Sequence, residues 1–121
     1  MLSLPAFITL LITAIATATD VVRAAEYLKM SGLDAYFDKV ISATMVKEGK
    51  PSPYVYQYAC ETLGLDPSVC IAVEDAPNGI KSAFSAGLRV IMVPDQSPME
   101  DELKDMVEYC VECLDELCEV L

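Results

Sequence analysis

Three short segments of this chain carry side chains that could bind a phosphate and a divalent metal. The adjacent acids Glu74 and Asp75 follow a short apolar run, and carboxylate oxygens are the ligands that Mg²⁺ prefers. Lys50 lies in the loop GKPSP, where two prolines restrict the backbone, and a positioned lysine stabilises charge on a transferring phosphoryl group. Thr17 ends another apolar run, so its hydroxyl and the amides of Ala18 and Thr19 could hydrogen-bond a phosphate.

Each of these residues also has an ordinary structural interpretation. Asp75 could cap the helix that begins near Pro77, with Glu74 as a solvated neighbour. Lys50 could be an exposed loop lysine, and Thr17 an ordinary β-branched strand residue. Their combination, in this order along the chain, favours a shared site in which Lys50 is catalytic and also binds phosphate.

Strands and helices alternate along the sequence. Apolar runs predict strands that end near Thr17 and that cover residues 40–43, 70–73 and 89–93. Helices are predicted after a cap at Asp20 as far as Gly32, from Pro53 to Gly64, up to Gly87, over 98–109 and at the end of the chain. The helical spacing predicts these inward-facing side chains: Val21, Ala24, Ala25, Leu28, Val55, Ala59, Leu63, Ile80, Ala83 and Phe84.

The order of these elements predicts the fold class. Short apolar strands that alternate with helices indicate a mostly parallel sheet covered on both faces, a three-layer α/β/α architecture. Ligands bind at the carboxyl ends of the strands in such sheets. Thr17, Lys50, Glu74 and Asp75 all fall at or after those ends, and a chain of 121 residues predicts a single domain.

Composition narrows the possible partners and the compartment. With 8 basic residues, 19 acidic residues and a net charge of -11, the chain lacks the clustered cations of a nucleic-acid-binding protein. The acidic segment 95–121 is interpreted as a solvated helical face, with a partner-binding tail as the alternative. An odd number of cysteines, 5, without regular spacing favours a reducing cytoplasm and partly buried thiols. The CxxC formed by Cys110 and Cys113, with Cys118 nearby, lacks a fourth zinc ligand.

Residues 1–19 carry no charged side chain. One hypothesis is that residues 1–18 are a secretory or membrane-attached leader with an A-x-A cleavage site at 16–18. No Lys or Arg precedes the apolar part, however, and its β-branched residues favour a buried strand over a membrane span. We therefore expect no membrane partner.

Residues 15–117 resemble the haloacid dehalogenase (HAD) superfamily, in particular the branch of β-phosphoglucomutase and phosphoglycolate phosphatase-like enzymes. The segments that carry the resemblance are IATAT at 15–19, GLDAYFD at 32–38, GKPSP at 49–53, and VEDAPNGI at 73–80 with the Ala-Gly at 86–87. It implies a Rossmann-like core and Mg²⁺-dependent phosphoryl transfer on a small phosphorylated metabolite through an aspartyl-phosphate. In this family, the residues at Thr17 and Lys50 contact the phosphoryl group, and those at Glu74 and Asp75 bind Mg²⁺.

The family's nucleophilic aspartate lies in a DxD motif on a first strand that is followed by a helical cap domain. Neither is visible in this sequence, since the only acid before Glu26 is Asp20, after the Thr17 segment. We therefore expect a single partial core domain, 1–121, with an atypical apolar segment at 1–14 and a family-like part at 15–121. Such a chain would be inactive alone, and the alternative is a truncated, non-catalytic binding module.

The missing strand would lie between the strands that end near Thr17 and Val73. Those two strands would then pair directly, or residues 1–11 would partly fill the place, or an open edge would remain. An open apolar edge would favour self-association of the chain.

Overall fold

The computed structural model describes residues 13–95 and 97–121, and the strands in this part of the chain form two sheets. In the first, β1 (Ala14–Thr17) pairs with β2 (Lys39–Ser42). In the second, β4 (Arg89–Met92) lies between β3 (Ile71–Glu74) and β5 (Tyr109–Cys110). Every pair is parallel, as the sequence predicts, but the strands do not form one sheet.

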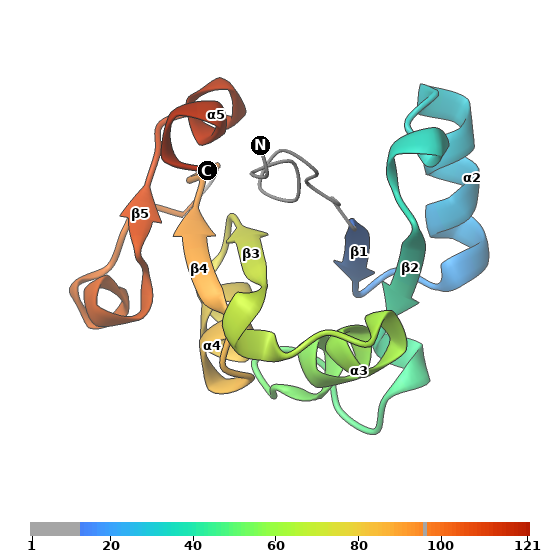
Figure 1. The fold of residues 1–121 in the computed structure, drawn as a ribbon, viewed down its shortest axis with the longest axis horizontal. Helices are drawn as coiled ribbons and strands as arrows, with labels where there is room; N and C mark the ends of the chain where they lie inside the picture. The colour runs from blue at the N-terminus through green and yellow to red at the C-terminus, as the bar shows by residue number, and fades with distance from the viewer. Residues whose placement is uncertain (1–12, 96) are drawn as a thin grey trace, which may run out of the picture.

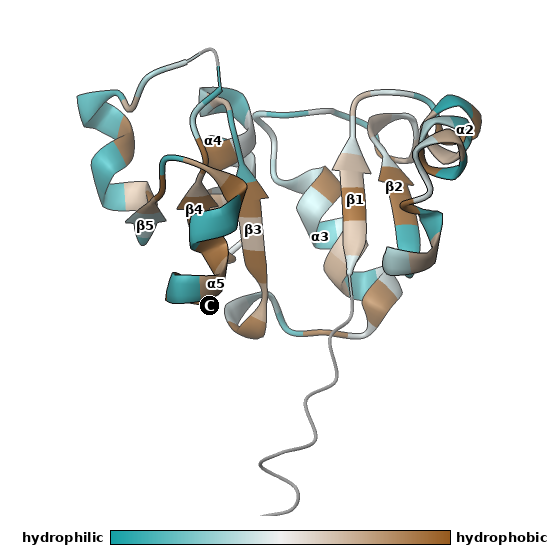
Figure 2. Cartoon of the chain, turned by 90° about the horizontal axis from the view of Figure 1, so that it is seen from above, coloured by the Kyte–Doolittle hydropathy of each residue, from teal (hydrophilic) through white to brown (hydrophobic). Residues whose placement is uncertain are grey.

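The carboxyl ends of the strands lie on the same side of the molecule. Thr17 is in register with Ser42, and Glu74 is in register with Met92. Figure 2 shows the arrowheads of β1, β2, β3 and β4 pointing the same way. Thr17 and Glu74, the last residues of β1 and β3, therefore lie at the edge where parallel sheets bind ligands.

Four α-helices in the described residues accompany the strands: α2 (Val21–Ser31), α3 (Tyr54–Leu63), α4 (Pro77–Ser85) and the short α5 (Leu117–Val120). Figure 1 shows α3 and α4 side by side below the strands, with α2 beside β2. Short 3₁₀ helices form much of the connecting chain: Asp34–Tyr36, Ala43–Met45, Pro67–Val69, Asp101–Met106 and Leu114–Glu116.

Local chemistry sets the ends of α2 and α3 where the sequence predicts them. Asp20 Oδ1 accepts a hydrogen bond of 3.1 Å from the amide of Arg23, which satisfies one free donor at the start of α2. Gly32 and Gly64 adopt left-handed φ values of 73° and 69° at the ends of α2 and α3, a conformation that costs glycine little. These predicted helix boundaries are confirmed.

The core lies where α4 meets the β3–β5 sheet and where α3 packs against α4. Its fully buried side chains include Val55, Ile80, Val90, Met92 and Leu103. Burial of each such aliphatic side chain stabilises the fold by about 1.5 to 3 kcal/mol. The inward positions predicted for Val55, Ala59, Ile80 and Ala83 are confirmed, as is that of Ala24.

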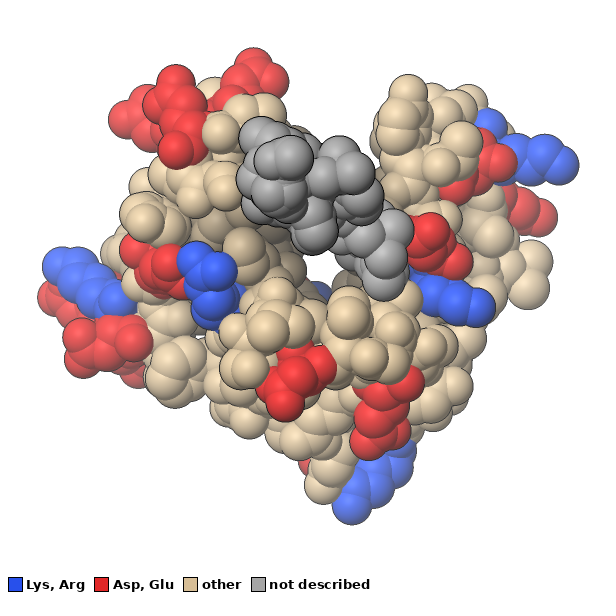
Figure 3. Space-filling view, in the orientation of Figure 1, with Lys and Arg blue, Asp and Glu red and all other residues tan. Residues whose placement is uncertain are grey.

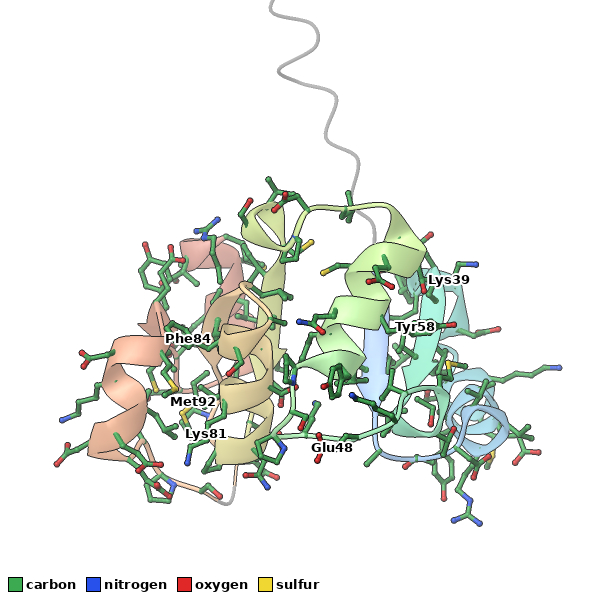
Figure 4. The ribbon with its side chains drawn as sticks, turned by 90° about the horizontal axis from the view of Figure 1, so that it is seen from below. Lys39, Glu48, Tyr58, Lys81, Phe84 and Met92 are labelled. Carbon is green, nitrogen blue, oxygen red and sulfur yellow. The ribbon has the colours of Figure 1, made fainter. Side chains whose placement is uncertain are left out.

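Two residues predicted to face inward are exposed, and three are only half-buried. Phe84, labelled in Figure 4, is 47% exposed, and Ala25 on α2 is exposed as well. Helical spacing identifies a face, but neighbouring elements decide how much of it is covered, and on α4 they cover the Ile80 and Ala83 side. The half-buried residues are Val21, Leu28 and Leu63.

The helix predicted over residues 98–109 is wrong. A 3₁₀ helix occupies Asp101–Met106, and the chain then extends along β4 as β5. The amide of Glu108 donates to the carbonyl of Val90 at 2.8 Å, and the Arg89 guanidinium donates two bonds, of 2.6 and 2.7 Å, to the Glu108 carboxylate. The hydrogen bond to Arg89 holds the pKa of Glu108 below its usual range. Pairing with β4 therefore replaces helix formation here, and helical structure in the described part of 95–121 is limited to two short 3₁₀ helices and α5, which confirms the helix predicted at the end of the chain.

The five cysteines are all free thiols, and three are more exposed than the sequence predicts. Cys60 is buried and Cys70 is half-buried. Cys110, Cys113 and Cys118 are exposed, because they lie in the edge strand β5 and in the short segments that follow it.

The hypotheses on the N-terminal segment fall largely on residues 1–12, which lie outside the described residues. The strand predicted to end at Thr17 is confirmed as β1. In the described ranges, none of the helices is long and apolar enough to span a bilayer.

The strands β1 and β3 belong to different sheets, so the direct pairing considered above is wrong for the described residues. Figure 3 shows an opening through the surface between the half that contains β1 and β2 and the half that contains β3 and β4. Self-association through an open edge remains a prediction.

Candidate functional site

The side chain of Lys50 joins the ends of two strands that lie in different sheets. Its Nζ forms an ion pair with Glu74 Oε1 at the end of β3. The same ammonium donates to the carbonyl of Ala16, next to the end of β1, at 3.4 Å. The Glu74 side chain is only 7% exposed and the Lys50 side chain 23%, so both charges depend on each other for compensation.

Tyr56 on α3 contacts both members of the Lys50–Glu74 ion pair. Its hydroxyl donates a hydrogen bond to Glu74 Oε1, and its ring centroid lies 5.2 Å from Lys50 Nζ, within range of a cation–π interaction. Burial raises the pKa of the Tyr56 phenol far above its ordinary range, and the Glu74 carboxylate raises it further. Tyr56 therefore stays protonated and donates to Glu74.

The loop that carries Lys50 is held by backbone and side-chain hydrogen bonds. The amide of Ser52 donates to the carbonyl of Gly49 at 3.0 Å, which closes the turn around Lys50. The hydroxyl of Ser82, fully buried on α4, donates to the carbonyl of Ser52 at 2.6 Å. The position of Lys50 is thus fixed to α4 as well as to Glu74.

The turn after β1 is fixed in a similar way. Thr17 Oγ1 accepts a hydrogen bond of 3.0 Å from the amide of Thr19, so the Thr17 hydroxyl keeps its own proton to donate. The fully buried Ser42, at the end of β2, donates to the carbonyl of Thr19 at 2.8 Å. Ala18 is exposed at the tip of this turn. The Thr19 amide, one of the predicted phosphate donors, is engaged by Thr17.

The two adjacent acids have different environments. Glu74 is buried and paired, whereas Asp75 is exposed. The interpretation of Asp75 as a helix cap is wrong, because the N-cap of α4 is Ala76 and has no side-chain hydrogen bond. The interpretations of Glu74 as a solvated neighbour and of Lys50 as an exposed loop lysine are wrong as well.

The donor set fits a hydrated Mg²⁺ better than a metal held wholly by protein. Within residues 13–95 and 97–121, no group of three or more His, Cys, Asp and Glu side chains could hold a metal ion. Mg²⁺ is commonly held by one or two carboxylates together with several waters. Asp75 and Glu74 fit that limited role, with Asp75 the more accessible of the two.

The structure brings Lys50 and Glu74 into contact and places both beside the end of β1, one residue from Thr17. Sequence reasoning missed the residues that hold them: Tyr56, Ser42 and Ser82. A signal for Tyr56 was present, because Tyr56 and Cys60 form a second i, i+4 pair beside Val55 and Ala59, and all four are buried. The burial of the two serines has no comparable signal in the sequence.

Comparison with known proteins places this chain in a family. The sequence model of the haloacid dehalogenase-like hydrolases matches residues 8–87. This range contains Thr17, Lys50, Glu74 and Asp75, and it covers more than half of the chain. The chain belongs to the haloacid dehalogenase-like hydrolases. The resemblance that the sequence carries at these positions is therefore confirmed at the level of the family.

Relatives of this haloacid dehalogenase-like chain include sugar phosphatases. Hexitol phosphatase A of Escherichia coli is 39% identical over 101 residues, which are 82% of this chain and 46% of the relative. A putative β-phosphoglucomutase from Thermotoga maritima has a similar structure, with a TM-score of 0.79 and 32% identity over 92% of this chain and 54% of that one. The structure of CbbY from Rhodobacter sphaeroides in complex with phosphate gives a TM-score of 0.78 and 30% identity, over 95% and 51%. The chain thus spans about half the length of each of these proteins.

Proposed function

We propose that this chain forms the phosphate- and magnesium-binding part of a phosphoryl-transfer site for a small phosphorylated metabolite. The observation that carries the proposal is the position of Lys50, whose ammonium contacts the ends of β1 and β3 together. A fixed cation at the carboxyl edge of parallel strands is suited to an anionic ligand. A relative that is a hexitol phosphatase and a similar structure that holds phosphate support the same ligand class.

Each candidate residue has a role consistent with its environment. Lys50 attracts phosphate oxygens, and the Thr17 hydroxyl and the Ala18 amide donate hydrogen bonds to them, whereas the Thr19 amide would first have to leave Thr17. Glu74 orients Lys50 and contributes to the metal site, while the exposed Asp75 supplies the principal carboxylate for Mg²⁺. Bound Mg²⁺ would neutralise phosphate charge.

Covalent phosphoryl transfer needs a nucleophile that these residues do not provide. Lysine, threonine and the acidic pair position and neutralise charge, and no acid precedes Asp20 in the chain. We infer that residues 1–121 alone bind phosphate and Mg²⁺ weakly without turning over a phosphate ester.

Binding can be tested by titrating the ¹⁵N-labelled chain with Mg²⁺ and, separately, with inorganic phosphate. We expect Mg²⁺ to shift the amide signals of residues 74 and 75, and Asp75→Asn to weaken Mg²⁺ binding about tenfold or more, since it removes the accessible charged ligand. We expect phosphate to shift residues 16–19 and 50, and Lys50→Met to abolish those shifts.

Asp101→Asn is the matched control for Asp75→Asn. Asp101 is an exposed acid that pairs with Lys104 in the 3₁₀ helix Asp101–Met106, and Asp101→Asn removes one negative charge, as Asp75→Asn does. Equal loss of Mg²⁺ affinity in both variants would mean that Mg²⁺ responds only to the overall negative charge, and the proposed site would be wrong.

Catalysis by the chain alone is the second test. With p-nitrophenyl phosphate and Mg²⁺, we expect release of nitrophenol at the rate of the buffer blank, because no group is available to accept the phosphoryl group. Hydrolysis above the blank that disappears in Asp75→Ala would show that a nucleophile is present and would overturn this part of the proposal.

A further inference from the structure

We propose that Cys60 and Cys70 form an oxidative modification site, at which a hydroperoxide converts the two thiols into an intramolecular disulfide. The two sulfur atoms lie 3.9 Å apart, with Cys60 donating its S–H toward Cys70. They come from different elements, since Cys60 is buried on α3 and Cys70 is half-buried immediately before β3. A sulfur–sulfur bond of about 2.05 Å requires only a modest further approach of the two side chains.

The two thiols differ in their access to solvent. Burial raises the pKa of Cys60 to about 12, with a further contribution from the neighbouring Cys70, so Cys60 remains a thiol. Cys70 is nearer the surface, where its S–H lies 3.4 Å from the carbonyl of Asp66. An open surface depression lined by Cys60, Leu65 and Asp66 reaches the Cys60 side of the pair, and the half-buried Cys70 is the more exposed of the two residues. Cys70 is therefore the sulfur that reacts first.

The chemistry balances with a hydroperoxide as the oxidant. The Cys70 thiolate attacks the terminal oxygen, the O–O bond breaks, and the alkoxide or hydroxide leaves, which gives a sulfenic acid. Cys60 then attacks the Cys70 sulfur, its proton passes to the departing hydroxide, and water is released as the S–S bond forms. The two thiols lose two electrons in total, and the peroxide gains them.

The disulfide would join the two elements that meet at the candidate site. Cys60 lies one helical turn after Tyr56 on α3, and Cys70 lies four residues before Glu74. Since Tyr56 donates to Glu74, the covalent bond and this hydrogen bond would connect the same two elements at separate points. Oxidation would thus hold α3 against β3.

The test uses a variant in which the three exposed cysteines are replaced, Cys110→Ser, Cys113→Ser and Cys118→Ser. These side chains are exposed, so the fold should tolerate their loss, and only Cys60 and Cys70 remain. After treatment with hydrogen peroxide, we expect two thiols to be lost, the monomer mass to fall by about 2 Da, and a reductant to reverse both changes. Proteolytic mapping should recover a linked peptide pair containing Cys60 and Cys70, also from the wild-type chain.

The matched control adds Cys70→Ser to the same background. We expect this variant to show no intramolecular link, and its remaining thiol Cys60 to react slowly. The melting temperature of the oxidised triple variant should exceed that of the reduced form by about 5 °C, because the link restricts the unfolded chain. Addition of oxygen to Cys70 without a linked peptide, or a link that lowers the melting temperature, would overturn the proposal.

Discussion

Gly79→Ala is expected to lower the free energy of unfolding by about 2 kcal/mol, although alanine normally favours a helix over glycine. Gly79 lies in α4 with an ordinary helical φ, so alanine alone would stabilise the helix by about 1 kcal/mol. A Cβ at this position, however, would overlap the carboxylate of Glu74. That carboxylate is buried and engaged by Lys50 and Tyr56, so it cannot move without losing both partners. Urea denaturation of both chains measures the difference.

A double variant identifies the cause. In Glu74→Ala the carboxylate is gone, and adding Gly79→Ala should then cost nothing further or should stabilise the helix slightly. The coupling between the two substitutions should be about 2 kcal/mol. Asn78→Ala, at an exposed position of the same helix, controls for helix propensity and should not destabilise the chain. Additive effects of Gly79→Ala and Glu74→Ala would show that the overlap with Glu74 is not the reason.

Glu74→Gln is expected to lower the free energy of unfolding by about 2 kcal/mol, even though glutamine has nearly the same shape. Its amide oxygen can still accept the hydrogen bond from Tyr56, so the change isolates the loss of negative charge beside Lys50. Breaking a fully buried ion pair costs about 3 to 5 kcal/mol, and the expected value is lower because the Lys50 side chain remains 23% exposed. Denaturant unfolding at neutral pH is the measurement.

Glu102→Gln provides the control for this change. Glu102 pairs with Lys81, labelled on α4 in Figure 4, but both side chains are exposed, at 59% and 37%. An exposed pair contributes less than about 1 kcal/mol because water screens it, and high salt should reduce its effect further. If the two variants lost the same stability, the burial of the Glu74 pair would have no energetic importance.

The elements that sequence reasoning predicted correctly are those set by local chemistry. Asp20 and Gly32 bound α2 through a side-chain cap and a left-handed backbone, and both depend only on nearby residues. The segment 98–109 was misassigned because its structure depends on a distant partner, the edge of β4, where Arg89 and Val90 bind Glu108. The helix propensities of residues 98–109 contain no information about pairing with a distant strand.

The candidate site divides in the same way. The types and order of Thr17, Lys50 and Glu74 predict residues at strand ends, and the strands do end at Thr17 and Glu74. Lys50 bonds to Glu74, which is 24 positions away, and Tyr56 bonds to the same oxygen. These contacts follow from three-dimensional packing and not from sequence spacing. The residue types therefore predict that these side chains lie at the carboxyl ends of the strands. Only the structure shows that the charges of Lys50 and Glu74 neutralise each other.

Because Lys50 bonds to Glu74, binding of an anion to Lys50 would compete with the contact that holds the two sheets together. The ammonium that would attract an anion also connects the two sheets to each other. An anion that draws Lys50 toward itself weakens the connection between the sheets. Part of the binding free energy of the anion then offsets the loss of that connection. We therefore expect the proposed anion site to show a lower apparent affinity than the same lysine would show if other contacts joined the two sheets.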